Sequence, residues 1–233
     1  MLWVAFMAHP IIVCGHGSGI SDAVARRFGK EGHPVAIVAR NAERLSGAAK
    51  ALRDAGVNAQ AFPCDLGNVE AVQRLVADVR SALGPIGVLH WNAYVGGAGD
   101  LTTATAQDLR GVLDVTVLGL VSAMQASLPD LKANRGAVLI TGGGFAFYDP
   151  NVDTAITQFQ AAGLAIGKAA QHKTAGILSK ALEPQGVYVG EVVVTGLVKG
   201  TAFDSGNATL EASAIADKFW SLYRDRAPAT VTI

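Results

Sequence analysis

The sequence predicts an α/β protein, with one doubly wound parallel sheet that is covered by helices on both faces. Three observations support this fold class. Short runs rich in Val, Ile and Leu alternate with helix-period segments, the runs lack polar alternation, and a glycine-rich turn follows the first run. Continuous apolar strands indicate a sheet buried on both faces, and strict β-α alternation with right-handed crossovers gives parallel strands.

The strands follow from the apolar runs, each of which is short and bounded by turn residues. They are expected at residues 11–14, 34–39, 59–64, 88–91, 137–141 and 187–194, with a short edge strand at 229–233. This order of elements is typical of a Rossmann-type domain. No linker, repeat or low-complexity tract interrupts it, so residues 1–233 are expected to form a single domain.

The helices follow from apolar residues at a spacing of three or four. Ile20, Val24 and Phe28 lie on one helical face, and Thr105 with Asp108 resembles a capping box at the start of a long apolar helix. Helices are expected at 20–28, 45–52, 72–83, 105–128, 161–182 and 210–223.

Composition excludes several classes of protein. The 233 residues carry 19 basic and 19 acidic side chains and are 50% hydrophobic, which excludes a disordered chain. Without a basic block, a nucleic-acid surface is not expected. The two cysteines favour a reducing cytoplasm. The apolar start, residues 1–6, is too short for a membrane span and lacks a signal peptide's positive charge. Met7 could be the natural start, with residues 1–6 a non-native extension, and both alternatives stay open.

The glycine-rich turn lies between the first strand and the first helix. Glycines at this point let the backbone approach a pyrophosphate, whose charge is favoured by the helix N-terminus. A dinucleotide is therefore expected to contact the turn, through Gly15, His16, Ser18, Gly19 and Ile20.

Several motifs in the correct order resemble those of the short-chain dehydrogenase/reductase family. The turn Gly15-x-x-x-Gly19-Ile20 resembles the family's TGxxxGIG motif, and Trp91-Asn92-Ala93-Tyr94 resembles its NNAG motif. The resemblance runs roughly from residue 11 to residue 223. It implies that further residues contact the cofactor: Asp65, Leu66, Asn92, Ala93, Lys168, Gly196 and Val198.

The end of the second strand indicates which cofactor is bound. An acid at this position would bind the ribose 2′-hydroxyl of NAD, whereas an arginine accommodates a 2′-phosphate. The position holds Ala39, and Arg40 follows it. Because a guanidinium can grip a phosphate with paired hydrogen bonds, NADP(H) is expected rather than NAD(H).

The catalytic pattern that the resemblance implies is incomplete. Lys168 matches the family's lysine, but Leu164 stands in place of the catalytic tyrosine and Gly142 in place of the serine. Thr116 replaces the family's asparagine. The segment 145–160 is longer than usual and is expected to rebuild the loop beside the substrate.

Possible substitutes lie where strands end. Tyr148 or Tyr94 could supply a proton and Thr141 could bind a carbonyl, although either tyrosine could instead lie at the rim with its hydroxyl in water. We therefore expect Lys168, Thr141 and Tyr148 to be catalytic. His16, His90 and His172 share no metal-ligand spacing, and no metal site is expected.

Three functions remain open at this point. The first is an atypical NADP(H)-dependent reduction of a carbonyl or enone in a small molecule. The second is a catalytically silent dinucleotide sensor or partner subunit, and the third is a non-redox lyase, isomerase or cyclase on the same fold. The resemblance also implies a homodimer or homotetramer, formed through the two long apolar helices at 105–128 and 161–182.

Overall fold

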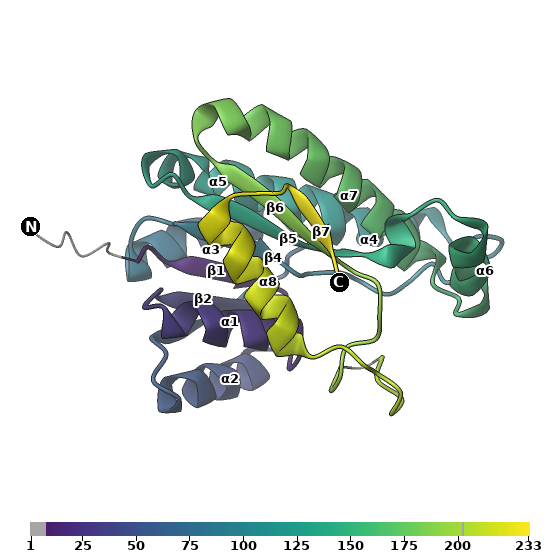
Figure 1. The fold of residues 1–233 in the computed structure, drawn as a ribbon, viewed down its shortest axis with the longest axis horizontal. Helices are drawn as coiled ribbons and strands as arrows, with labels where there is room; N and C mark the ends of the chain where they lie inside the picture. The colour runs from purple at the N-terminus through teal and green to yellow at the C-terminus, as the bar shows by residue number, and fades with distance from the viewer. Residues whose placement is uncertain (1–7, 202) are drawn as a thin grey trace, which may run out of the picture.

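The structure, a computed structural model, describes residues 8–201 and 203–233. Its seven parallel strands form one sheet in the order β3-β2-β1-β4-β5-β6-β7, and helices lie on both sides of this sheet (Figure 1). The predicted fold class is confirmed. The strands are β1 (Ile11–Cys14), β2 (Val35–Ala39), β3 (Ala59–Pro63), β4 (Val88–Trp91), β5 (Ala137–Gly143), β6 (Tyr188–Val194) and β7 (Thr230–Thr232). The strand order reverses between β1 and β4, and ligands bind at the carboxyl ends of strands beside such a switch point.

The helices begin and end close to the residues that the apolar spacing predicts. Asn41, Asn68, Thr105 and Asp149 cap four of them through side-chain oxygens, and Thr105 with Asp108 forms the predicted capping box. The helices are α1 (Ile20–Lys30), α2 (Ala42–Asp54), α3 (Val69–Leu83), α4 (Ala106–Leu113), α5 (Leu120–Ala133), α6 (Pro150–Gln158), α7 (Ala162–Leu182) and α8 (Ala212–Asp225).

Two apolar cores lie on opposite faces of the sheet. One core contains Trp91 of β4, Leu120 of α5 and further side chains of α3, α5 and α7. The second core contains Phe28 of α1, Phe219 of α8 and further side chains of α1, α2 and α8. The strands contribute alternate residues to each core. This arrangement explains why the strand sequences are apolar throughout.

The predicted continuous helix at 105–128 is instead α4, a π-helical turn η1 (Asp114–Gly119) and α5. In the turn, the Thr116 hydroxyl donates to the Val112 carbonyl at 2.7 Å. A Cβ at Gly119 would meet the Leu66 carbonyl oxygen, so glycine permits the close approach of this turn to the end of β3. By length and composition the run Ala106–Ala133 is apolar enough to cross a membrane, but here α5 packs on α3 and β4.

Three loops follow the carboxyl ends of neighbouring strands: residues 92–105 after β4, 144–161 after β5, whose helix α6 lies at the far right in Figure 1, and 195–211 after β6. The first two are joined where Gly163 N–H donates to the Ala98 carbonyl at 2.8 Å. The expected rebuilt loop at 145–160 contains helix α6, which the apolar spacing did not predict. Helix α8 begins at Ala212 rather than Leu210, because Leu210 pairs with Val198 in an isolated bridge.

Candidate functional site

The glycine-rich turn folds as the sequence predicts for a dinucleotide site. Gly15 has a φ of +83°, and a Cβ there would lie 2.6 Å from the backbone of Ala93. The N–H groups of Gly15 and His16 both donate to the Val38 carbonyl, at 3.0 and 2.8 Å. These contacts hold the turn against the ends of β2 and β4.

The helix that follows the turn offers the features that a pyrophosphate requires. The N-cap residue of α1, Gly19, makes no side-chain hydrogen bond, so the first N–H groups of this helix have no cap, unlike those of α2, α3, α4 and α6. A Cβ at Gly17 would meet nothing within 4 Å, which leaves open space above the turn. The Ser18 hydroxyl contacts the Gly200 carbonyl at 3.5 Å. The residues present therefore fit a diphosphate group.

The residues at the ends of β2 and β3 are arranged around this turn. Arg40 is exposed, and Arg44 in α2 donates from Nη2 to the His16 carbonyl at 3.1 Å. Arg44 was missed by the sequence reading, although it lies one helical turn beyond Arg40. Asp65 is exposed while Leu66 is 5% exposed, so only Asp65 presents its side chain to solvent.

At the end of β4, the predicted cofactor residue Asn92 is used inside the protein. Its Nδ2 donates to the Ser21 hydroxyl at 2.7 Å, and that hydroxyl donates to the Gly15 carbonyl at 2.7 Å. Asn92 therefore positions the glycine turn, and Ala93 packs against Gly15. In the loop after β6, Val198 is buried by its bridge to Leu210, and Gly196 lies against the Leu210 side chain.

Lys168 is the buried cation of the site. Its Nζ donates to the Thr141 carbonyl at 2.7 Å and to Gln171 Oε1 at 3.0 Å. Burial lowers the pKa of Lys168 from 10.5 to about 8, and the nearby Glu191 carboxylate opposes this shift. Because its polar partners are backbone and amide oxygens, the amine keeps one N–H for a ligand.

Gln171 connects Lys168 to the π-helical turn. Its Nε2 donates to the Thr116 carbonyl at 3.3 Å, while its Oε1 accepts from Lys168, and the side chain is fully buried. The Thr116 hydroxyl is already bonded to Val112, so it offers no free group to the site. The sequence reading missed Gln171, whose only signal is a polar residue three positions after Lys168.

Gly142, which stands at the position of the family's serine, leaves room for a carboxylate. A Cβ there would lie 2.5 Å from Glu191 Oε1, an atom with no hydrogen-bond partner among the described residues. Oε2 of Glu191 is 2.6 Å from His172 Nδ1, and burial raises the pKa of this carboxyl group, which is only 1% exposed. The sequence reading missed Glu191, although it is the one charged residue in the strand YVGEVVV.

A double-mutant cycle tests this packing. We expect Gly142→Ala to lower the free energy of unfolding by about 2 kcal/mol, because the added methyl group forces the buried carboxylate to move. In a Glu191→Ala background the same change should cost less than half as much. Chemical denaturation of the four proteins measures the coupling; an equal cost in both backgrounds would contradict the contact.

Thr141 and His90 lie on the opposite face of the sheet from Glu191. The Thr141 hydroxyl is 3.2 Å from His90 Nε2, and the His90 ring packs edge-on against Phe219 of α8. Thr141 is 5% exposed. Its hydroxyl is therefore engaged with His90, and it is the Thr141 carbonyl that contacts Lys168. The expected binding of a substrate carbonyl by this hydroxyl has no geometric support.

The two candidate tyrosines are placed differently. The Tyr148 side chain is 98% exposed, and no hydrogen bond or ring contact joins it to another described residue of the site. Tyr94 is half-buried, with its ring centroid 5.9 Å from Lys168 Nζ, and burial raises the pKa of its hydroxyl. The expectation that Tyr148 is the catalytic tyrosine is therefore not supported by its position, because the residue beside the lysine is Tyr94.

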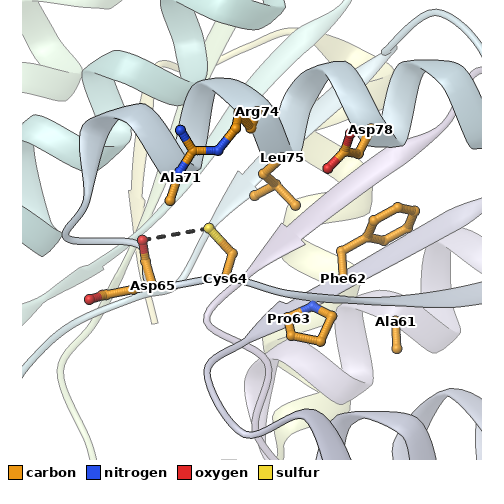
Figure 2. Close-up of a pocket in the computed structure, with 9 residues that line it drawn as sticks. All are labelled: Ala61, Phe62, Pro63, Cys64, Asp65, Ala71, Arg74, Leu75 and Asp78. Atoms are coloured by element: carbon orange, nitrogen blue, oxygen red, sulfur yellow. Dashed lines mark hydrogen bonds between the residues drawn. The ribbon is translucent and has the colours of Figure 1, made fainter.

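A separate hollow of about 390 Å³ lies between the edge strand β3 and α3 (Figure 2). Arg74 and Asp78 reach over it from the helix, and Cys64 Sγ contacts the Asp65 carbonyl at 3.5 Å. Burial raises the pKa of Cys64 to about 11, so its thiol is unreactive at neutral pH. Throughout residues 8–201 and 203–233, no three His, Cys, Asp or Glu side chains are grouped to hold a metal ion.

Comparison with known proteins agrees with this fold. The family model described as short chain dehydrogenase matches residues 9–209, and the chain belongs to that family. A short-chain dehydrogenase from Burkholderia cenocepacia, solved in complex with NADP, superimposes with a TM-score of 0.83 at 25% identity over 97% of each chain.

Two curated relatives are similar over part of their length. A Streptomyces coelicolor protein with the name "Putative ketoacyl reductase" is 40% identical over 133 residues, which is 57% of this chain and 49% of the relative. A 3beta-hydroxysteroid dehydrogenase from Mediterraneibacter gnavus is 27% identical over 183 residues, 76% of this chain and 65% of the relative. The matches thus span between half and two thirds of these relatives.

Proposed function

We propose that this protein binds NADP(H) along the carboxyl edge of the sheet and reduces a carbonyl or enone group of a small molecule. The observation that carries the proposal is the buried Lys168, held in place beside a half-buried tyrosine. The glycine turn with its uncapped helix and the neighbouring Arg40 and Arg44 support a phosphorylated dinucleotide. The NADP-bound relative supports the same cofactor.

In this proposal the side chains divide the work between binding and proton transfer. Lys168 donates its remaining N–H to a ribose hydroxyl and keeps a positive charge near Tyr94. Tyr94 keeps its proton at neutral pH, since its pKa is raised, and donates it to the substrate oxygen. A bound nicotinamide would supply the hydride, which together with this proton would convert a carbonyl to an alcohol or an enone to a saturated ketone.

Three variants test these roles, with NADPH binding by calorimetry and NADPH oxidation by absorbance as readouts. We expect Tyr94→Phe to lower kcat by about 10²-fold or more while the Kd for NADPH stays unchanged. Lys168→Met should weaken NADPH binding about tenfold, through loss of a charge-assisted hydrogen bond. Tyr148→Phe is the matched control, and it should behave as the wild-type protein does.

The outcomes separate the proposal from its alternatives. NADPH binding without oxidation by any ketone, quinone or enone would favour a sensor or partner subunit. Product formation without loss of NADPH absorbance would favour a lyase or isomerase. A protein that binds no dinucleotide would contradict the proposal as a whole. The proposal also includes a homodimer or homotetramer, which sedimentation analysis can establish.

A further inference from the structure

The exposed apolar side chains are not spread evenly over the molecule. Within the described residues, nine large apolar side chains are exposed, and seven of them lie in the three loops that follow β4, β5 and β6. They include Phe147, Phe159 and Leu197. These loops all follow the carboxyl ends of strands, and Tyr94 in the first of them has its ring centroid 5.9 Å from Lys168 Nζ. Clustered exposed apolar surface marks a binding site.

Two of these side chains form an aromatic wall beside the lysine. The ring centroids of Tyr94 and Phe203 are 6.1 Å apart and the ring planes are tilted by 31°. Tyr94 is 41% exposed and Phe203 is 52% exposed, so both rings keep free surface. The wall joins the loop after β4 to the loop after β6, and Tyr94 faces Lys168 Nζ. A flat molecule that stacks on this wall lies next to the amine.

The same loops are almost free of positive charge. Residues 92–105, 144–161 and 195–211 contain one basic residue, Lys199, and no histidine. Lys199 Nζ is paired with Glu211 Oε1 at 2.5 Å. The acidic residue Asp204 is also engaged, because its carboxylate accepts the N–H groups of Gly200 and Gly206. A carboxylate or phosphate on the substrate would therefore find no free cation in these loops.

From these observations we infer that the site takes an uncharged, flat, apolar ketone, of which aromatic ketones are the simplest case, and that Phe203 selects it by stacking. The inference rests on the proposed function in one respect, the identity of the reacting group as a carbonyl. It goes beyond that function by stating the chemistry of the rest of the substrate. Selection by Phe203 is a binding property, so it can be measured whether or not reduction takes place.

The experiment compares two probes that differ in one charge, 2-acetylnaphthalene and 6-acetyl-2-naphthoic acid. Binding of each to the full chain saturated with NADP⁺ is measured by calorimetry, and reduction is measured separately with NADPH. We expect the neutral ketone to bind at least tenfold more tightly than the acid. Phe203→Ala should weaken binding of the neutral ketone about tenfold without changing the Kd for NADPH. Ile177→Ala, an equally exposed apolar residue on α7, is the control and should change neither value.

A second variant distinguishes a loss of substrate binding from a loss of folding. Phe203→Lys adds a cation to the wall, and it should reverse the preference so that the carboxylate probe binds more tightly than the neutral ketone. Equal affinity for the two probes, no affinity for either, or an unchanged preference in both Phe203 variants would overturn the inference. Tight binding of the neutral ketone without reduction would instead overturn the proposed reduction and leave the inferred substrate class in place.

Discussion

Between pH 7 and pH 3, His90 alone is expected to lower the free energy of unfolding by roughly 4 kcal/mol. Burial lowers the pKa of this imidazole from 6.5 to about 3, and the charge of Lys168 acts in the same direction. Above pH 6.5 the ring is neutral in both the folded and the unfolded chain. As the pH falls from 6.5 to 3, the unfolded chain takes up a proton that the folded protein does not, so stability is lost across this window.

The measurement is urea denaturation of the wild-type protein and of His90→Gln at a series of pH values. The glutamine amide can still bond the Thr141 hydroxyl but does not titrate. The substitution can shift the free energy of unfolding by an amount that does not depend on pH. The test is therefore whether the free energy of unfolding falls less steeply with pH in the variant than in the wild-type protein below pH 6.5. Parallel stability curves for the two proteins would show that His90 is not buried as a neutral ring.

Gly15→Ala is expected to lower the free energy of unfolding by about 3 kcal/mol. Two costs add: a left-handed backbone conformation that alanine rarely adopts, and a Cβ placed 2.6 Å from the Ala93 backbone. The backbone of β4 cannot yield easily, because the Ala93 segment follows a strand buried in the middle of the sheet. The same substitution should also weaken NADPH binding, since it moves the turn.

Gly17→Ala is the matched control, only two residues away. Its Cβ would meet nothing within 4 Å and its φ lies outside the left-handed region, so stability should change by less than about 0.5 kcal/mol. Thermal unfolding of both variants compares the two positions directly. A similar loss of stability in the two variants would mean that the turn does not pack against Ala93.

The fold could be predicted from the sequence because each strand is a short apolar run and every helix except α6 has a clear apolar spacing. The strand Val88–Trp91 was predicted residue for residue, and the edge strand β7 was also anticipated. The π-helical break at Asp114–Gly119 was not predicted. It depends on the Thr116 hydroxyl and on the contact of Gly119 with Leu66, and neither is visible in the local sequence pattern.

The site was only partly predictable. Lys168 and the glycine turn lie in local motifs, so the sequence alone predicts them as cofactor-binding residues, and this role stays a prediction. Glu191 and Gln171 act through partners that are 19 and 55 residues away in the chain, so their roles depend on how α7 lies over β6 and η1. Tyr148 and Tyr94 both follow strands in the sequence, and only the three-dimensional structure distinguishes them, through the exposure of Tyr148 and the place of the Tyr94 ring beside Lys168.

The amine of Lys168 is already oriented and stripped of water before any ligand arrives, since two internal oxygens hold it in place. The free-energy cost of desolvating and ordering this amine is therefore already part of the folding reaction. A ligand that accepts the remaining N–H forms this hydrogen bond with little further loss of side-chain entropy at Lys168. The same preorganisation limits the position of the accepting atom to a narrow range of directions. Lys168 therefore selects ligands by the position of their acceptor atom as well as by charge.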